Sequence, residues 1–116
     1  MNFGYPLVDA NTYINAPEHK VTPQNAIAAA GFREWKYACS PQEDFAEQVF
    51  YHEIAPGDDG MAWAELVNEK LKLAVKVSYR TAELPYLVQW KQMGQGEYVM
   101  GLEPANCFPE GQANIS

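Results

Sequence analysis

One carboxylate, that of Glu103, stands where regular structure should stop. Pro104 follows it directly, and because a proline has no N–H to donate to a β ladder, the strand that carries Glu103 should end there. A carboxylate at a strand end can do chemistry on a small polar ligand. The alternative is a solvated glutamate at a strand terminus.

The residues near Glu103 favour a sugar as that ligand. Alternation along the strand puts Glu103 on the same face as Gly101, whose missing side chain leaves room beside the carboxylate. The preceding strand brings Trp90 and Lys91 close, although they point to opposite faces. Sugar rings have apolar C–H faces and polar edges, so an aromatic ring beside polar groups suits them. The alternatives are a core position for Trp90 and a solvated one for Lys91.

Glu47 and Gln48 are a second polar insertion in an apolar segment. One of the two must face inward and needs a hydrogen-bond partner, which is either a ligand hydroxyl or a structural group. His19 and His52 are isolated in the sequence, and no Cys or His pair has zinc-site spacing, so we expect no metal site. The sequence also contains no Gly-rich phosphate loop and no nucleophile elbow.

The elements that must position these residues are strands. From Leu71 to Arg80 apolar and polar residues alternate strictly, which predicts a strand with one buried and one wet face. Turn residues at Pro56–Gly60 and Met93–Gly96 separate it from similar segments. We therefore predict an antiparallel meander of five strands, over residues 46–54, 61–67, 71–80, 86–92 and 97–103.

The N-terminal part is less regular. Short strands are predicted at Phe3–Val8, Thr12–Ala16 and His19–Val21. One short helix should follow, with Thr22 as its cap, Pro23 in its first turn, residues 26–30 in its body and Gly31 at its end.

Composition sets the class and excludes some partners. A chain of 116 residues, 47% hydrophobic and 20% charged, suits one folded domain, and the strand pattern makes it all-β, an antiparallel β-sandwich. With a net charge of −7 and no cluster among its eight Lys and Arg, we expect no nucleic-acid partner. The sequence has no apolar run of membrane-spanning length, and its start does not have the pattern of a signal peptide. We therefore expect a cytoplasmic protein. Cys39 and Cys107 are two reduced thiols or a disulfide.

Three segments resemble the C-terminal part of aldose 1-epimerase (galactose mutarotase)-like proteins, in an uncharacterised branch known as a domain of unknown function. They are Phe45–His52, Leu84–Lys91 with its Gln-Trp-Lys, and Tyr98–Cys107 with its Gly-Leu-Glu-Pro. The start, Asn2–Leu7, is similar to that branch's His-x-Asn-x-Gly segment without its histidine. The resemblance implies a galactose mutarotase-like β-sandwich, of which residues 1–116 would be an incomplete C-terminal part.

The resemblance also implies a reaction, the interconversion of sugar anomers without a cofactor. Glu103 matches the glutamate base, while Glu47, Gln48, Trp90, Lys91 and Asn2 would bind the sugar. The histidine acid of the family would lie just before Met1, so we expect a fragment that begins at an internal Met. Such a fragment would leave a sheet edge uncovered, through which it could associate with itself. The alternatives are a noncatalytic carbohydrate-binding module and a metal-dependent small β-barrel enzyme.

Overall fold

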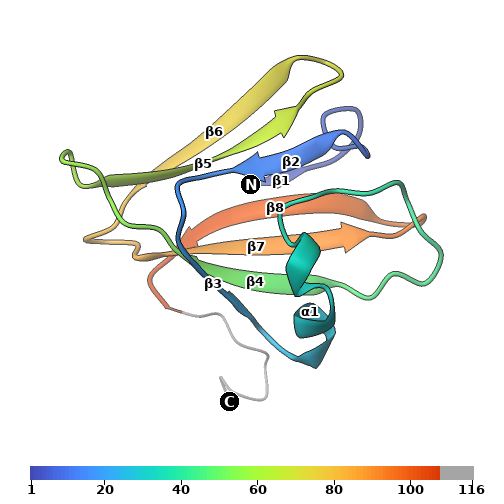
Figure 1. Cartoon of the computed structure of the whole chain (residues 1–116), viewed down its shortest axis with the longest axis horizontal. Coiled ribbons are helices and arrows are strands. Elements are labelled where there is room, and N and C mark those ends of the chain that lie inside the picture. Colours follow the sequence, from blue (N-terminus) through green and yellow to red (C-terminus); the bar gives the residue numbers. More distant parts are fainter. Residues whose placement is uncertain (108–116) are drawn as a thin grey trace.

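The computed structural model describes residues 1–107 and contains two antiparallel sheets (Figure 1). One sheet has five strands in the order β1-β8-β7-β4-β3, and the other has three in the order β2-β5-β6. The predicted continuous meander is wrong, because β5 and β6 pair with β2 in the smaller sheet and β4 pairs with β7; only the β5–β6 and β7–β8 hairpins hold. The predicted class, an all-β antiparallel sandwich with one short helix, is confirmed. The elements are β1 (Asn2–Phe3), β2 (Thr12–Asn15), β3 (Lys20–Pro23), α1 (Ala26–Ala30), η1 (Phe32–Glu34), β4 (Gln48–Glu53), β5 (Met61–Asn68), β6 (Leu73–Arg80), β7 (Tyr86–Met93) and β8 (Tyr98–Ala105).

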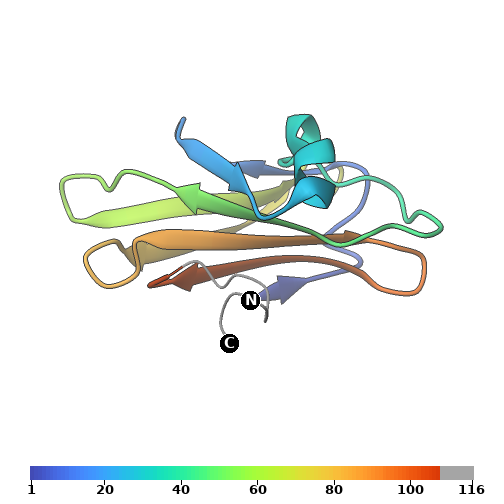
Figure 2. The ribbon, with the colours of Figure 1, turned by 90° about the horizontal axis from the view of Figure 1, so that it is seen from below.

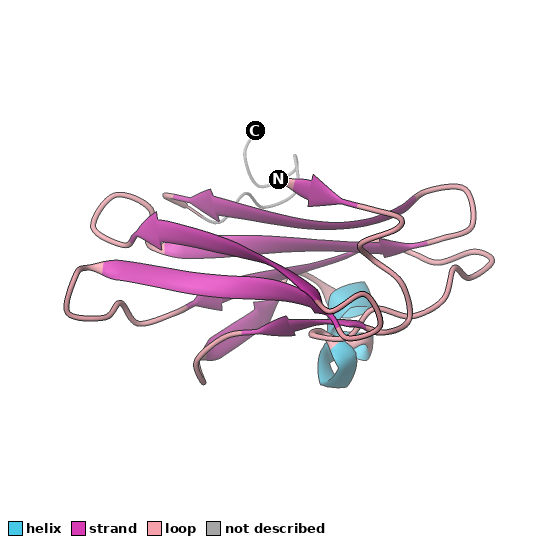
Figure 3. Ribbon diagram, turned by 90° about the horizontal axis from the view of Figure 1, so that it is seen from above, coloured by secondary structure: helices cyan, strands magenta, loops and turns pink. Residues whose placement is uncertain are grey.

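The main core lies where the three-stranded sheet meets the inner face of the five-stranded sheet (Figure 3). Leu66 is fully buried on the first sheet, and Leu87, Met100 and Leu102 are buried on the second. Each such side chain stabilises the fold by roughly 1.5–3 kcal/mol through its removal from water. This core makes β7 and β8 the rigid centre of the larger sheet.

The helical segment covers another part of the same inner face, where α1 lies over β3 and β4 (Figure 2). Two polar side chains of β7 hold the chain around η1 by its carbonyl groups. Gln89 Nε2 donates to the Trp35 carbonyl at 2.7 Å, and Lys91 Nζ donates to the Glu34 carbonyl at 2.7 Å. The inner face of the large sheet is thus covered by two different layers, the three-stranded sheet and the helical segment.

Two predictions about the helix are wrong. Asn25, not Thr22, caps α1, since its side chain accepts a hydrogen bond from the Ala28 N–H at 3.0 Å. Thr22 and Pro23 instead belong to β3, which pairs with β4. Because β3 is an edge strand, it tolerates a proline without losing an inner ladder bond. Gly31 ends α1 as predicted.

The other local predictions hold in part. The alternating strand is confirmed from Leu73 onward, but Leu71 lies in the preceding turn and Leu73 is 55% exposed. The predicted strand at Phe3–Val8 is wrong beyond Phe3, because Pro6 cannot donate to a ladder and residues 5–7 form a turn. In the part of the chain from residue 1 to 107, no helix is long and apolar enough to cross a bilayer.

Candidate functional site

Glu103 lies on the outer face of the five-stranded sheet, two residues before the end of β8. The prediction that the strand ends at Glu103 is wrong, because Pro104 and Ala105 still pair with Leu87 and Tyr86 of β7. The register partner of Glu103 on β7 is Val88, and the next outward pair toward the strand's start is Gly101 with Trp90. The Glu103 side chain is 56% exposed. It borders a depression of about 360 Å³, the outer pocket, which is lined by Asn2, Glu47, Trp90, Glu97, Val99 and Glu103.

Four of the six residues predicted to form the site therefore meet in this pocket. Glu47 precedes β4, Trp90 lies on β7, Glu103 on β8 and Asn2 on β1. Their convergence follows from strand order, because β1, β8, β7 and β4 are consecutive neighbours in the sheet. Residues up to 101 positions apart in the sequence thus line one pocket.

Gly101 allows its neighbours to approach closely instead of leaving open space. A Cβ at this position would lie 2.6 Å from Asn2 Oδ1 and 3.1 Å from Trp90 Cε3. The volume freed by the missing side chain is thus occupied by the Asn2 amide and the Trp90 ring. Both groups line the same pocket as Glu103.

The chain around Met1 lies directly beside this carboxylate. The Met1 nitrogen donates to the Leu102 carbonyl at 3.0 Å and to Glu103 Oε1 at 3.1 Å. In return, the Leu102 N–H donates to the Met1 carbonyl at 2.8 Å. This pairing extends the β1–β8 ladder and fixes the position of Met1 relative to Glu103.

Gln48 and Lys91, the other two predicted sugar-binding residues, lie on the inner face. They are cross-strand partners, so their side chains project to the same side of the sheet. Both line a different cavity, and Lys91 is 4% exposed. The structure therefore separates Gln48 and Lys91 from the outer pocket by the thickness of the sheet.

The side chains that line the outer pocket are acidic, and the Met1 ammonium group forms an ion pair with one of them, Glu103. Glu47, Glu97 and Glu103 line the pocket, and among residues 1–107 no Lys, Arg or His side chain does. Its carboxylates can accept hydrogen bonds from hydroxyl groups, and the Trp90 ring offers an apolar surface. Glu97 and Val99 were not predicted as site residues. Side chains alternate along a strand, so Glu97 is expected on the same face as Glu103 and could have been predicted from that alternation.

The two histidines are not isolated as the sequence suggested. His19 Nε2 and His52 Nδ1 are 2.7 Å apart, and His52 Nε2 donates to Gln89 Oε1 at 2.8 Å. The Gln89 amide is oriented by its bond to the Trp35 carbonyl, so the His52 proton is on Nε2 and His19 donates to Nδ1. Burial lowers the pKa of His52 to about 3, so this ring is neutral at pH 7. The pair lies on the inner face of the sheet, away from Glu103.

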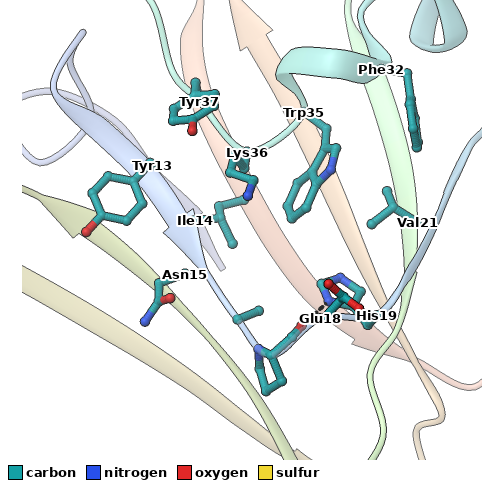
Figure 4. Close-up of a pocket in the computed structure, with 12 residues that line it drawn as sticks. Tyr13, Ile14, Asn15, Glu18, His19, Val21, Phe32, Trp35, Lys36 and Tyr37 are labelled. Atoms are coloured by element: carbon teal, nitrogen blue, oxygen red, sulfur yellow. Dashed lines mark hydrogen bonds between the residues drawn. The ribbon is translucent and has the colours of Figure 1, made fainter.

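An aromatic pocket of about 440 Å³ lies beside the histidine pair (Figure 4). Trp35, Lys36 and Tyr37 border it from the segment after η1, opposite residues of β2. The Trp35 ring meets that of His52 edge-on, with centroids 4.8 Å apart. Trp35, His52 and Gln89 thus connect the segment after η1 to the inner face of the five-stranded sheet.

The described residues provide no group of three or more His, Cys, Asp or Glu side chains that could hold a metal ion. Cys39 and Cys107 are both free thiols, so the disulfide alternative is not realised in the structure. Burial raises the pKa of the Cys39 thiol. That thiol borders the inner-face cavity together with Lys91.

Comparison with known proteins agrees with the resemblance seen in the sequence. The chain is similar to a solved structure from Klebsiella pneumoniae subsp. pneumoniae MGH 78578 named "putative aldose 1-epimerase", with 28% identity and a TM-score of 0.87. The match covers 94% of this chain and 29% of that one, so the chain spans less than a third of the length of this relative. The fold is thus confirmed as galactose mutarotase-like. No curated protein matched the chain. A family profile matches residues 1–115, and the chain belongs to that family, the domain of unknown function DUF4432.

Proposed function

We propose that the chain is the C-terminal part of an aldose 1-epimerase-like protein that acts on the anomeric centre of a free sugar. The observation that carries the proposal is the meeting of Glu103, Glu47, Trp90 and Asn2 at the outer pocket. The similarity to the Klebsiella structure supports the same activity class. A pocket lined by carboxylates and an indole ring offers acceptors for sugar hydroxyls and a flat surface for the ring.

In the proposed reaction Glu103 removes the proton from the C1 hydroxyl group. An acid protonates the ring oxygen, the C1–O5 bond breaks, and an open-chain aldehyde forms. Rotation about C1–C2 and the reverse proton transfers close the ring as the other anomer. Glu47 and Asn2 would hold sugar hydroxyls, and Trp90 would lie against the ring.

The acid in this proposal is a histidine immediately before Met1, in a longer form of the chain. The position of the Met1 nitrogen supports it, since that atom lies 3.1 Å from Glu103 Oε1. A residue attached to Met1 would begin next to the carboxylate. His19 and His52 are not candidates, because they face the other side of the sheet and bond to each other.

The test compares anomer exchange rates of several aldoses, measured by NMR, in a chain with histidine added before Met1. Glu103→Gln should lower the catalysed rate by about 10²–10⁴-fold, the usual contribution of a positioned acid or base. Alanine in place of the added histidine should cause a similar loss. Glu83→Gln, an exposed glutamate outside the pocket, is the matched control and should leave the rate unchanged. An unchanged rate in Glu103→Gln would contradict the assignment.

A noncatalytic carbohydrate-binding module is the second candidate. The observation that favours it is the lack of any His side chain among the described residues that line the outer pocket. This reading expects saturable sugar binding, seen as a change in Trp fluorescence that Trp90→Phe abolishes. It also expects no rate enhancement with or without the added histidine. Binding without catalysis in both forms would favour the module over the enzyme.

A further inference from the structure

The inner face of the five-stranded sheet contains a cavity of about 340 Å³ that the proposed function does not use. Its polar lining residues, which define the inner cavity, are Glu34, Tyr37, Cys39, Gln42, Gln48 and Lys91. Glu34 and Gln42 are exposed, so they form the entrance of the cavity, whereas Lys91 forms its floor.

Lys91 is a buried amine whose pKa burial lowers, while the nearby Cys39 and Glu34 side chains favour its ammonium form. Its residue is 4% exposed, yet Nζ makes one hydrogen bond, to the Glu34 carbonyl at 2.7 Å. Among residues 1–107 the recorded ion pairs involve Met1 and Lys20, and none involves Lys91. An ammonium group has three N–H donors, and neither Glu34 nor Cys39 forms a recorded ion pair with Lys91, so Lys91 has capacity for a further anion.

Gln48 is the second group with unused capacity. Its Oε1 is buried and has no hydrogen-bond partner. The amide lies over Gly31, where a Cβ would be 2.5 Å from Oε1, so the glycine makes space for it. As the register partner of Lys91, Gln48 presents an acceptor on the same face as the ammonium group.

We propose that the inner cavity is a second ligand site, which binds a small hydroxycarboxylate. The carboxylate would accept hydrogen bonds from Lys91 Nζ, and the neighbouring hydroxyl would donate to Gln48 Oε1 once the buried amide turns toward the cavity. One ligand thereby supplies both the negative charge and the donor that these two buried groups lack. A neutral sugar supplies hydroxyl donors but no charge, so it suits the outer pocket better than this one.

L-lactate is the probe, titrated into the 116-residue chain and followed by calorimetry. Lactate should bind saturably, propionate, which lacks the hydroxyl, several-fold more weakly, and neutral lactamide not at all. Lys91→Met should weaken lactate binding by about tenfold or more, as expected for a charge-assisted hydrogen bond. Gln48→Leu should reduce lactate to the affinity of propionate. Lys70→Met, an exposed lysine outside the cavity, and Glu103→Gln should bind lactate normally.

A measurement on the unaltered protein covers the case in which Lys91→Met does not fold. Saturating lactate should raise the pKa of Lys91, followed by NMR of its ζ nitrogen, because a bound carboxylate favours the ammonium form. A lysine that only holds the Glu34 carbonyl would show no such rise. The absence of lactate saturation in the millimolar range, or an unchanged Lys91 pKa in its presence, would overturn the proposal.

Discussion

At the scale of single residues, alternation along each strand decides which side chains lie on the same face of the sheet and can line one pocket. Glu103 and Trp90 lie on the outer face of the large sheet, whereas Gln48 and Lys91 lie on the inner one. The alternation seen in the sequence correctly placed Trp90 and Lys91 on opposite faces. It could not show which face would be covered by α1 and η1, because that contact joins segments more than 50 residues apart.

The histidine pair could not be predicted for the same reason. His19 and His52 meet because β3 pairs with β4, and neither residue carries a local signal for that register. What the sequence did contain was the Gly101–Glu103 spacing, a period-two relation within one strand. The Gly101–Glu103 relation could be predicted from alternation within one strand, whereas the convergence of Asn2 and Glu47 on Glu103 came only from the family resemblance, because it depends on strand order.

Gly101 is the residue whose substitution should affect the outer pocket most directly. In Gly101→Ala the new methyl group would meet Asn2 Oδ1 and Trp90 Cε3, so one of these groups must move. We expect weaker sugar binding, by several-fold, in a Trp fluorescence titration. Gly96→Ala is the matched control, since nothing lies within 4 Å of its added Cβ. Equal binding by both variants would show that the pocket does not depend on this close approach.

His52 should make the stability of the fold depend on pH. The folded protein holds His52 neutral down to a pKa of about 3, whereas the unfolded chain binds the proton near pH 6.5. The unfolded state therefore binds more protons between these values, so stability is greatest above pH 6.5 and falls as the pH falls toward 3. Each pH unit in this window removes about 1.4 kcal/mol from the free energy of unfolding.

The measurement is urea unfolding at neutral pH and at about pH 4.5, where the wild-type loss from His52 is on the order of 3 kcal/mol. His52→Gln is expected to be less stable at neutral pH but to lose less stability on acidification. Because the carboxyl groups are common to both proteins, the difference between the two losses isolates His52. Equal losses would show that this ring is not the group that titrates.

At the scale of elements, α1 depends on its cap. The helix spans only Ala26–Ala30, which is too short to be stable by itself, so its ends and its packing determine whether it forms. The Asn25 side chain satisfies the Ala28 N–H, and the Gly31 N–H bonds to the Ala28 carbonyl at 3.0 Å. Helix formers at 26–30 were visible in the sequence, but Thr22 and Asn25 are both good caps. Pairing of Thr22 in β3 decided between them.

Asn25→Ala should therefore lower the free energy of unfolding by about 1 kcal/mol. Asn25→Ser keeps a side-chain acceptor at the cap and should retain most of the stability. Urea unfolding curves of the two variants provide the comparison. Asn106→Ala, an exposed asparagine outside the described helices, is a control for the loss of an amide group. If serine failed to restore the stability lost with alanine, the cap would not be the cause.

At the scale of the whole molecule, the two sheets have four edge strands. They are β1 and β3 in the larger sheet and β2 and β6 in the smaller one. β6 is eight residues long, and Leu73 at its start is 55% exposed. A long strand with unpaired N–H and C=O groups and an exposed apolar residue is a template for pairing with another chain.

We expect the apparent molecular mass of the chain to rise with concentration through pairing along β6. Leu73→Lys should reduce this rise, because charged residues on an edge strand oppose pairing. Ile27→Lys changes a similarly exposed apolar residue on α1 and should leave the rise unchanged. Light scattering coupled to size-exclusion chromatography measures the mass. A constant monomer mass for the wild-type chain would exclude this mode of association.

The pairing of Met1 with Leu102 also has a practical consequence for every such experiment. An affinity tag or a protease-cleavage remnant at the amino end would emerge beside the Glu103 carboxylate, and it would replace the Met1 ammonium group with an amide. Preparations that differ only in these added residues would then differ in the charge and accessibility of the outer pocket. Assays of sugar exchange should therefore be compared between proteins with matched amino ends.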